Sequence, residues 1–381
     1  MGKLAPKWDD HLQPSNYTEA IHESSISVGS NLHLSPAVVF ISSPFRLIAA
    51  RLHALLISQR HGCGRGKGTL GPRLTNTTHD TKTNTKNMVE SRENEKNIGD
   101  YRIGRTIGTG GYANVKLGVH KTTGQKVALK LMSHDQLDSE RLSLIKKEIS
   151  IHSKIDHPHI VKVLDVIESE SLTCLVLEYV EGKDLLDTLD DYPDAKAARI
   201  ITQIASAIKY MHENGFVHRD IKLENIVVSK DGTCKLIDFG MAAEWNEKKA
   251  LKTPCGSIFY AAPELMLGRE YLGPKTDVWA LGVLLYCMLT GSIPWAGDDN
   301  NQQIEHVLRG QWTPIHGASI SMTSLLGGCL TVEEDTRLGI LDVLEHEWLS
   351  SHRELKSPSR RKVVKRNYSG TVKDLVKKIL N

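Results

Sequence analysis

The sequence predicts an α+β fold with two lobes, in which a small antiparallel β-sheet with one helix precedes a larger, mainly helical lobe. Two observations support this prediction. Strand-forming runs separated by glycine-containing turns fill residues 101–132, and a helical spacing of apolar residues dominates from residue 184 onward. The hydrophobic fraction of 40% and the charged fraction of 24% also suit an ordinary globular core.

The first lobe is predicted to contain five strands and one helix. Turn residues Gly110-Gly111 and Thr123-Gly124 separate the first three strands. A helix is expected over residues 139–155, and two further β-rich runs follow it. The predicted strands are 101–109, 112–119, 126–132, 160–167 and 172–178.

The second lobe is predicted from helical periodicity. Ile200, Ile204, Ile208 and Met211 form an apolar stripe, and Gly215 ends that helix. Residues 276–290 are almost wholly apolar, which predicts a helix buried in the centre of the lobe. Because the pattern ends near Leu349, we expect one folded unit over residues 99–349, divided into lobes at 99–180 and 181–349.

The two flanking segments differ from this unit in composition. Residues 24–79 contain no Asp or Glu. Residues 1–98 therefore allow three interpretations: a disordered extension, a mitochondrial-type targeting segment, or a stretch that is not translated, with Met88 as the true start. Residues 350–381 are predicted to be a basic tail, because residues 351–381 hold 10 Lys/Arg against 2 Asp/Glu.

The charges and the cysteines of the sequence indicate which partners and which cellular compartment to expect. Residues 99–350 carry a net charge of −9, from 26 basic and 35 acidic side chains, which favours basic substrates or a tail that folds back. The six cysteines form no Cys-x-x-Cys pair, so reduced thiols and a cytoplasmic or nuclear location are expected. No apolar run is long enough for a membrane span, so stable membrane insertion is not predicted. Nucleic acid is not expected as a partner either.

A glycine-rich segment and a lysine on the next strand could together hold phosphate. Residues 108–115 have the pattern Gly-x-Gly-x-x-x-x-Val between two strands, and glycine lets backbone N–H groups approach phosphate closely. By itself such a segment is more often a simple turn. Lys130 lies in an apolar strand, where its charge needs a partner, and Glu148 on the following helix is the natural one. The alternative is a surface lysine on an edge strand.

The segment 218–225, His-Arg-Asp-Ile-Lys-Leu-Glu-Asn, is the strongest signal, together with Asp238-Phe239-Gly240. Phosphoryl transfer needs a carboxylate that orients the attacking hydroxyl, and Asp220 is the candidate. It also needs oxygen ligands for Mg²⁺, and Asn225 and Asp238 are the candidates. Because both motifs occur together downstream of the lysine strand, we do not attribute them to chance.

These motifs, in this order, resemble the eukaryotic protein kinase domain over residues 99–349. Ala262-Pro263-Glu264, Asp277-x-Trp279-x-x-Gly282 and Arg337 extend the resemblance. It implies the bilobal kinase fold, with ATP and Mg²⁺ as cofactors and Lys130, Glu148, Asp220 and Lys222 as catalytic residues. It also implies an ATP site in which Ile107, Val115, Ala128 and Val227 sandwich the base, Glu178 and Val180 face adenine through their backbone, Asp184 meets the ribose, and Gly108, Gly110 and Lys130 hold the phosphates.

The lysine at position 222, two residues after Asp220, resembles the pattern of serine/threonine kinases. Residues 251–264 resemble the same segment of the calcium/calmodulin-dependent and AMP-activated kinase superfamily. The glycine-rich segment and Tyr271-Leu272-Gly273 are similar to maternal embryonic leucine zipper kinases and sucrose-non-fermenting kinases. The resemblance implies phosphorylation of Thr253 by an upstream kinase or by the enzyme itself. A phosphate there would give Arg219 a doubly charged partner. The alternative is that Thr253-Pro254 is a simple turn. The residues expected to support the segment are Arg219, Ser257, Glu264 and Arg337.

Acidic side chains suggest the substrate class. Five aspartates crowd the start of the second lobe, at 184, 187, 190, 191 and 194. By resemblance, Asp184 and Glu224 would contact an arginine three residues before the target, whereas the alternative is a solvated acidic surface. The tail segment 364–369 has that arginine spacing before Ser369, which suggests a tethered autophosphorylation site.

Two alternatives to an active protein kinase are a small-molecule phosphotransferase and a pseudokinase scaffold. The complete activation segment argues against the former. A scaffold typically lacks a catalytic or metal residue, whereas Lys130, Asp220, Asn225 and Asp238 are all present.

One departure concerns His152, one helical turn after Glu148. The family usually has an apolar residue there, packed on the phenylalanine that corresponds to Phe239. We expect either a histidine tolerated at a partly wet position or a group whose protonation loosens the active arrangement.

Overall fold

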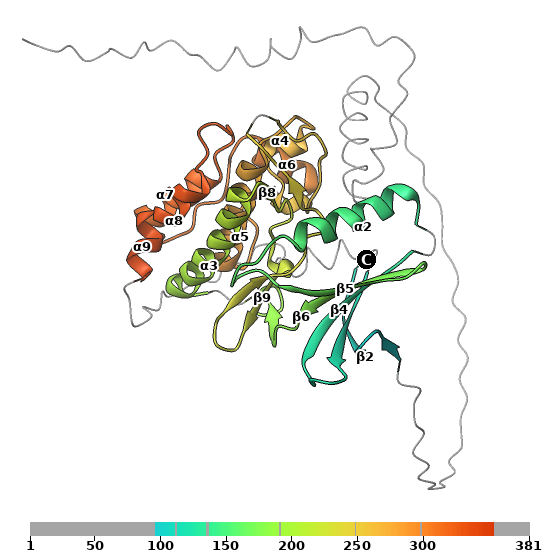
Figure 1. Ribbon diagram of the computed structural model, residues 1–381. Helices are drawn as coiled ribbons and strands as arrows, with labels where there is room; N and C mark the ends of the chain where they lie inside the picture. The colour runs from blue at the N-terminus through green and yellow to red at the C-terminus, as the bar shows by residue number, and fades with distance from the viewer. Residues whose placement is uncertain are drawn as a thin grey trace, which may run out of the picture. The chain divides into compact units, whose positions relative to one another are not determined.

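The computed structural model describes residues 96–353, apart from residues 111, 112, 135, 136, 190, 191, 248 and 298. The interpretations offered for residues 1–95, including Met88, and for the tail from residue 354 lie outside the described residues. Within the described range the chain has the predicted α+β architecture of two lobes (Figure 1).

The smaller lobe is built on a six-stranded antiparallel sheet with the strand order β1-β2-β3-β4-β6-β5. In β4 the side chains of Val127, Leu129 and Met132 are buried, as expected for a strand with one face on the core. All five predicted strands are confirmed, and the two-residue β1 is an addition. The strands are β1 Asn97–Ile98, β2 Tyr101–Thr109, β3 Asn114–His120, β4 Lys126–Ser133, β5 Val163–Glu168 and β6 Leu172–Glu178.

The strand predicted from residue 160 begins three residues later than expected. Ile160 forms an isolated parallel bridge with Leu236, and the Val161 N–H donates to the Leu236 carbonyl at 2.9 Å. The backbone of residues 160–161 is therefore already paired with the larger lobe, so β5 begins at Val163.

The predicted helix of the smaller lobe is α2, Ser139–His152. Asp138 caps it, because its carboxylate accepts the Arg141 N–H at 2.8 Å. The helix ends three residues before the predicted end, since the Ile155 N–H turns to the His152 carbonyl in a tighter, 3₁₀-type bond of 3.2 Å. Figure 1 shows α2 beside the sheet and close to the larger lobe.

The larger lobe is organised around α3, Asp194–Glu213, and α5, Gly273–Thr290. The predicted apolar stripe of α3 is fully buried, and the chain leaves the helix at Gly215, whose φ is +77°. In α5 nearly every side chain is buried, including Trp279 at 0% exposure, which confirms a central helix. The other helices are α4 Pro263–Met266, α6 Asn300–Leu308, α7 Ile320–Cys329, α8 Ile340–Glu345 and α9 Glu347–Arg353, with short turns η3 Leu223–Asn225 and η4 Ile258–Tyr260.

Five short strands of the larger lobe flank the functional segments, and Asp184 and Val227 lie on two of these strands. They form a sheet of order β10-β9-β7 and a two-stranded pair, β11-β8. The strands are β7 Gly182–Asp184, β8 Phe216–Val217, β9 Ile226–Ser229, β10 Cys234–Leu236 and β11 Ala243–Glu244. They hold the segments 218–225 and 238–240 against each other.

Two further properties concern the described range. Its five cysteines, at 174, 234, 255, 287 and 329, are all buried free thiols. No helix among the described residues has the length and apolar character that crossing a membrane would require.

Candidate active site

Lys130 lies where three elements of the two lobes meet. It projects from β4 and its Nζ lies 2.6 Å from Glu148 Oε1 on α2. The same Nζ lies 2.9 Å from Asp238 Oδ1, in the segment after β10. The lysine side chain is only 14% exposed, so both carboxylates compensate a charge that the apolar strand alone could not hold.

Electrostatics keep Lys130 and Asp238 ionised, whereas burial raises the pKa of the Glu148 carboxyl. Burial opposes the charge of Lys130, but Asp238 and Glu148 outweigh it and raise the pKa of the lysine above its usual range. Burial likewise opposes ionisation of Asp238. The Lys130 ammonium and the Gly240 N–H outweigh that effect and hold the pKa of the Asp238 carboxyl well below its usual range. Asp238 is therefore an anion near neutral pH, as a metal ligand must be.

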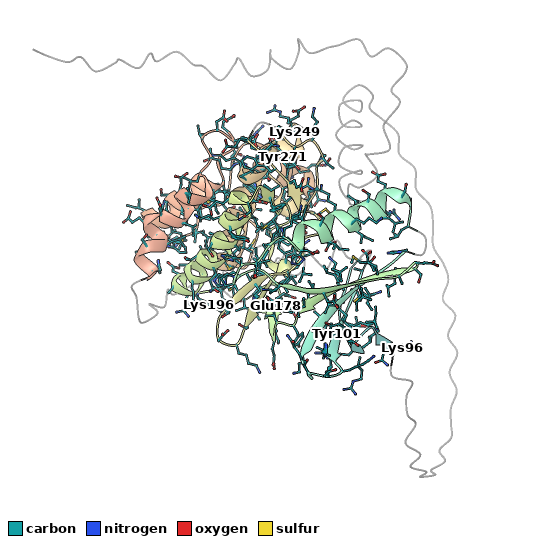
Figure 2. The ribbon with its side chains drawn as sticks, in the orientation of Figure 1. Lys96, Tyr101, Glu178, Lys196, Lys249 and Tyr271 are labelled. Carbon is teal, nitrogen blue, oxygen red and sulfur yellow. The ribbon has the colours of Figure 1, made fainter. Side chains whose placement is uncertain are left out.

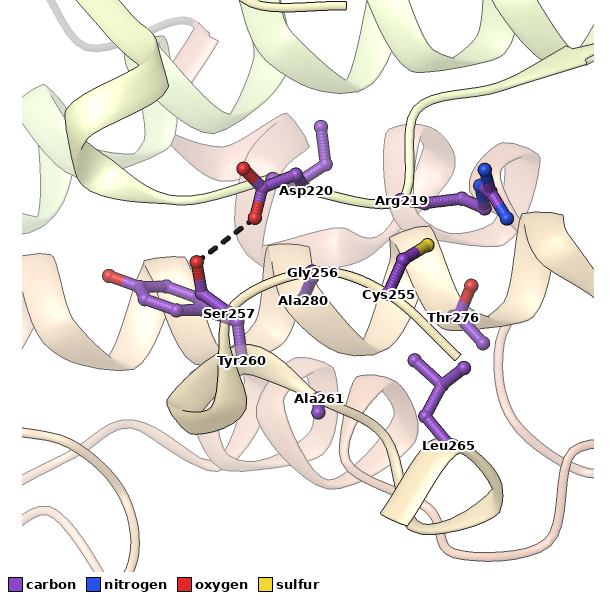
Figure 3. Close-up of a pocket in the computed structure, with 11 residues that line it drawn as sticks. Arg219, Asp220, Cys255, Gly256, Ser257, Tyr260, Ala261, Leu265, Thr276 and Ala280 are labelled. Carbon is purple, nitrogen blue, oxygen red and sulfur yellow. Dashed lines mark hydrogen bonds between the residues drawn. The ribbon is translucent and has the colours of Figure 1, made fainter. Parts of the chain in front are cut away.

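The Asp220 carboxylate is fixed on both oxygens. Oδ2 lies 2.8 Å from Lys222 Nζ and accepts the Asn225 amide at 3.0 Å. Oδ1 accepts the Ser257 hydroxyl at 3.0 Å, and Lys222 Nζ also contacts that hydroxyl at 2.9 Å. A lysine, an amide and a hydroxyl thus hold one carboxylate in a single orientation. Figure 3 shows the hydrogen bond between Asp220 and Ser257 among the residues that line a pocket.

Asn225 and Asp238 together form a donor set that fits Mg²⁺. The Asn225 Nδ2 donates to the Asp220 carbonyl at 2.8 Å and to its carboxylate, which turns the amide oxygen away from Asp220. The Ile237 N–H donates to the Asn225 carbonyl at 3.0 Å, so residues 225 and 238 lie on adjacent segments. The Asp238 side chain is 46% exposed and therefore accessible. Carboxylate and amide oxygens are the ligands that hard divalent cations prefer.

The segment before Asp220 is held in an unusual backbone conformation. Arg219 has φ of +67°, which is uncommon for a residue with a side chain and costs on the order of 1 kcal/mol. Asp277 of α5 compensates, because its carboxylate accepts the His218 N–H at 3.0 Å and the Arg219 N–H at 2.7 Å. His212 Nε2 lies 2.9 Å from the same carboxylate. The central helix therefore sets the geometry of the segment.

The glycine-rich segment leaves room for a ligand. The Gly110 N–H donates to the Ala113 carbonyl at 2.8 Å, and residues 111–112 lie outside the described range. Among the described residues, a Cβ built at Gly108 would meet only Val115, at 3.6 Å, and one at Gly110 only the Ala113 carbonyl, at 3.5 Å. Packing against these residues therefore does not require glycine at either position. Space for an approaching group, such as a phosphate, fits both.

The expected base-binding residues occupy paired strands. Gly108 lies opposite Val115 across β2 and β3, and Asp184 lies opposite Val227 across β7 and β9. Ile107 is on β2, Ala128 is on β4, and Val180 lies two residues after the end of β6.

Glu178 lies at the end of β6, where the two lobes meet (Figure 2). Its N–H donates to the Lys162 carbonyl at 2.9 Å, so only its carbonyl oxygen is left to face a base. Its side chain accepts the Lys162 N–H at 2.9 Å and the Lys235 ammonium at 2.5 Å. The connection between the lobes is thereby attached to both.

Of the residues expected to support Thr253, Ser257 bonds to Asp220 and Arg219 precedes it, whereas the Thr253 carbonyl reaches Arg219 through the Tyr271 hydroxyl. Thr253 is exposed, whereas Gly256 has φ of +97° and packs so closely that a Cβ would lie 2.5 Å from the Arg219 carbonyl. Glu264 and Arg337 form a buried two-bond pair at 2.7 and 2.9 Å, with exposures of 5% and 1%. The segment is thus fixed at its far end and in contact with Arg219 near its middle.

His152 is fully buried, so the expectation of a partly wet position is wrong. Its ring stacks on Phe239 at 4.1 Å, and His218 contacts the same phenylalanine at 5.1 Å. Nε2–H donates to the Val161 carbonyl at 2.7 Å. Burial lowers the pKa of His152 to about 4, so the ring is neutral near pH 7.

Sequence reasoning missed four contacts. The Tyr271 hydroxyl contacts both Arg219 and Thr253, Lys235 pairs with Glu178, and His212 pairs with Asp277. Tyr271 and Asp277 stood out only as parts of a resemblance, and nothing in the spacing indicated what they touch.

Comparison with known proteins identifies the family to which this chain is similar. Residues 101–349 match the family described as "Protein kinase domain". Over 262 residues the chain is 36% identical to the "Probable serine/threonine-protein kinase MARK-A" of Dictyostelium discoideum. The alignment covers 68% of this chain and 25% of that protein, so the chain spans about a quarter of the length of this relative.

Proposed function

The chain belongs to the protein kinase family, and we propose that it is a serine/threonine kinase that transfers the γ-phosphate of ATP to protein substrates with Mg²⁺ as cofactor. One observation carries the proposal. The Asp220 carboxylate is held by Lys222, Asn225 and Ser257. The segment that contains it is hydrogen-bonded to the segment that contains Asp238, which in turn pairs with Lys130. Such an arrangement has the parts that phosphoryl transfer requires.

The proposed chemistry divides among these side chains. Mg²⁺ bound at Asp238 and Asn225 would neutralise charge on the transferred group. Asp220 orients the substrate hydroxyl and accepts its proton as the new O–P bond forms and the bond from the γ-phosphorus to the departing ADP breaks. Lys222 lies 2.8 Å from that carboxylate and places a positive charge beside the reacting centre. Lys130, held by Glu148, supplies a second positive charge toward the phosphates of ATP.

We propose that the preferred substrates carry basic residues before the target serine or threonine. Glu224 Oε2 is buried and has no hydrogen-bond partner among the described residues, and burial raises the pKa of this carboxyl. A substrate guanidinium would supply the missing donors and favour the ionised form. Asp184, half-buried on β7, adds a second carboxylate, and Asp190 and Asp191 lie outside the described residues.

We also propose that phosphorylation of Thr253 activates the enzyme. The exposed side chain of Thr253 is accessible to an upstream kinase, and the Arg219 guanidinium is linked to the Thr253 carbonyl through one intervening hydroxyl. A phosphate in this position can pair with Arg219 and order the segment around Ser257.

Transfer of labelled phosphate from ATP to an Arg-x-x-Ser peptide, with Mg²⁺, tests the proposal. We expect Asp220→Asn to lower kcat by at least about 100-fold, in line with the loss of a general base. Asp165→Asn, the same change on the exposed strand β5, serves as the control and should leave kcat within twofold. Tight ATP binding by the parent without any transfer, even after treatment with an upstream kinase, would refute catalysis and leave the scaffold reading.

A further inference from the structure

The hydroxyl of Tyr271 lies between the two partners of the proposed switch. Tyr271 precedes α5 and is outside the segment that contains Thr253, yet its ring is buried, with 1% exposure. Its O–H donates to the Thr253 carbonyl at 2.8 Å and accepts from Arg219 Nη1 at 3.1 Å. A phenolic hydroxyl has one proton to donate and lone pairs to accept, so one arrangement satisfies both bonds.

The backbone of Tyr271 holds the same segment a second time. The Leu251 N–H donates to the Tyr271 carbonyl, and the Tyr271 N–H donates to the Leu251 carbonyl, both at 2.9 Å. Main chain and side chain thus fix the residues on either side of Lys252. Figure 2 places Tyr271 close to Lys249, at the start of this segment.

Arg219 is held in one orientation by contacts on two of its nitrogens. Nε donates to the Met241 carbonyl at 2.7 Å, and Nη1 donates to the Tyr271 hydroxyl. A guanidinium carries five N–H donors in one plane, so these two bonds fix the plane and leave further donors for an anion. Since the bonds through the hydroxyl measure 3.1 and 2.8 Å, the Arg219 nitrogen and the Thr253 carbonyl oxygen lie within about 6 Å of each other.

We propose that the Tyr271 hydroxyl is a positioning group for the Thr253 switch. It holds the main chain of Thr253 beside an oriented Arg219 before any phosphate is attached. A phosphate on Thr253 then meets its partner with little further loss of conformational freedom, so more of the pairing energy orders the active site. The inference rests on the proposed function and adds a residue outside the activation segment to it.

The first test compares activity before and after Thr253 is phosphorylated, with stoichiometry checked by mass spectrometry. It uses the full chain with Tyr271→Phe, which keeps the ring and removes the hydroxyl. Tyr192→Phe is the matched control, because this buried tyrosine also loses two hydrogen bonds, to Thr188 at 2.7 and 3.1 Å. We expect the activation ratio of Tyr271→Phe to fall about tenfold, as for bonds that include a charged donor. The ratio of Tyr192→Phe should match the parent.

A ratio for Tyr271→Phe within twofold of the parent would overturn the inference. An equal fall of the ratio in both variants would also overturn it, because loss of stability alone would then explain the effect. Thermal unfolding of both variants records that loss separately.

The second test needs no catalytic activity. Trypsin cleaves after Lys252, an exposed residue one position before Thr253, once the segment opens locally. We expect the unphosphorylated Tyr271→Phe protein to be cut there about tenfold faster than the parent, and Tyr192→Phe to be cut at the parental rate. Equal cleavage of parent and Tyr271→Phe would overturn the inference. A parent that gains no activity on phosphorylation would count against the proposed switch, while the cleavage rates still decide whether Tyr271 holds the segment.

Discussion

The stack of His152 on Phe239 predicts an acid-dependent loss of stability that one substitution removes. The pKa of His152 is about 4 in the folded protein, against 6.5 for an ordinary histidine. The unfolded chain therefore binds a proton at higher pH than the folded chain does. Stability is fully present above pH 6.5 and is lost as the pH falls through the window from 6.5 to 4.

The size of this loss follows from the two pKa values. At pH 5 nearly all unfolded chains carry the proton on residue 152 and about one folded chain in ten does, which lowers the free energy of unfolding by about 2 kcal/mol. Below pH 4 the loss approaches about 3 kcal/mol. The ring is almost wholly buried, so solvent screening does not reduce these values.

Urea unfolding of the full chain at pH 7 and pH 5 measures the effect. We expect His152→Leu to lose about 2 kcal/mol less than the parent between these values, because leucine keeps the contact with Phe239 and does not titrate. The exposed His316 provides the matched control, and His316→Leu should lose as much as the parent. Equal losses in the parent and His152→Leu would refute the reasoning, since the ring would then titrate normally when folded.

Two further substitutions test how the activation segment is held. Gly256→Ala places a Cβ 2.5 Å from the Arg219 carbonyl at a backbone φ of +97°. We therefore expect its free energy of unfolding, measured by thermal unfolding, to fall by about 2 kcal/mol and peptide phosphorylation to decrease. The control Gly268→Ala, with φ of +64° and open space around the Cβ, should show only the smaller backbone cost. Glu264→Gln leaves Arg337 buried with its charge uncompensated and should cost about 3 kcal/mol in urea unfolding. A cost below about 1 kcal/mol would show that the three other hydrogen bonds of the Arg337 guanidinium suffice.

The sequence predicted the structure best where burying a charged side chain, or exposing apolar ones, would be costly. A lysine on an apolar strand needs a partner, and the structure brings Lys130 to Glu148. The stripe of α3 and the apolar run of α5 marked the buried helices because their spacing or composition leaves no other face to solvent. The smaller sheet followed from strand-forming runs and turn residues.

The remainder depends on contacts between distant parts of the chain. β7 to β11 have two to four residues each, too few to show a period, and tertiary pairing alone forms them. The bonds of Tyr271 to Arg219 and Thr253 span 52 and 18 residues, and that of Lys235 to Glu178 spans 57. His152 was placed correctly on Phe239 but expected to be partly wet, because the sequence does not reveal how completely α2 covers that ring.

The carboxylate of Asp277 links the fate of the catalytic segment to that of the core. It lies on α5, at 1% exposure, and holds the N–H groups of His218 and Arg219. Because α5 is buried along almost its whole length, it cannot open without the larger lobe. The segment that presents Asp220 therefore belongs to the most cooperative unit of the domain, although its only regular structure is the short turn η3. Heat or denaturant should abolish the active geometry in the same step that melts the core.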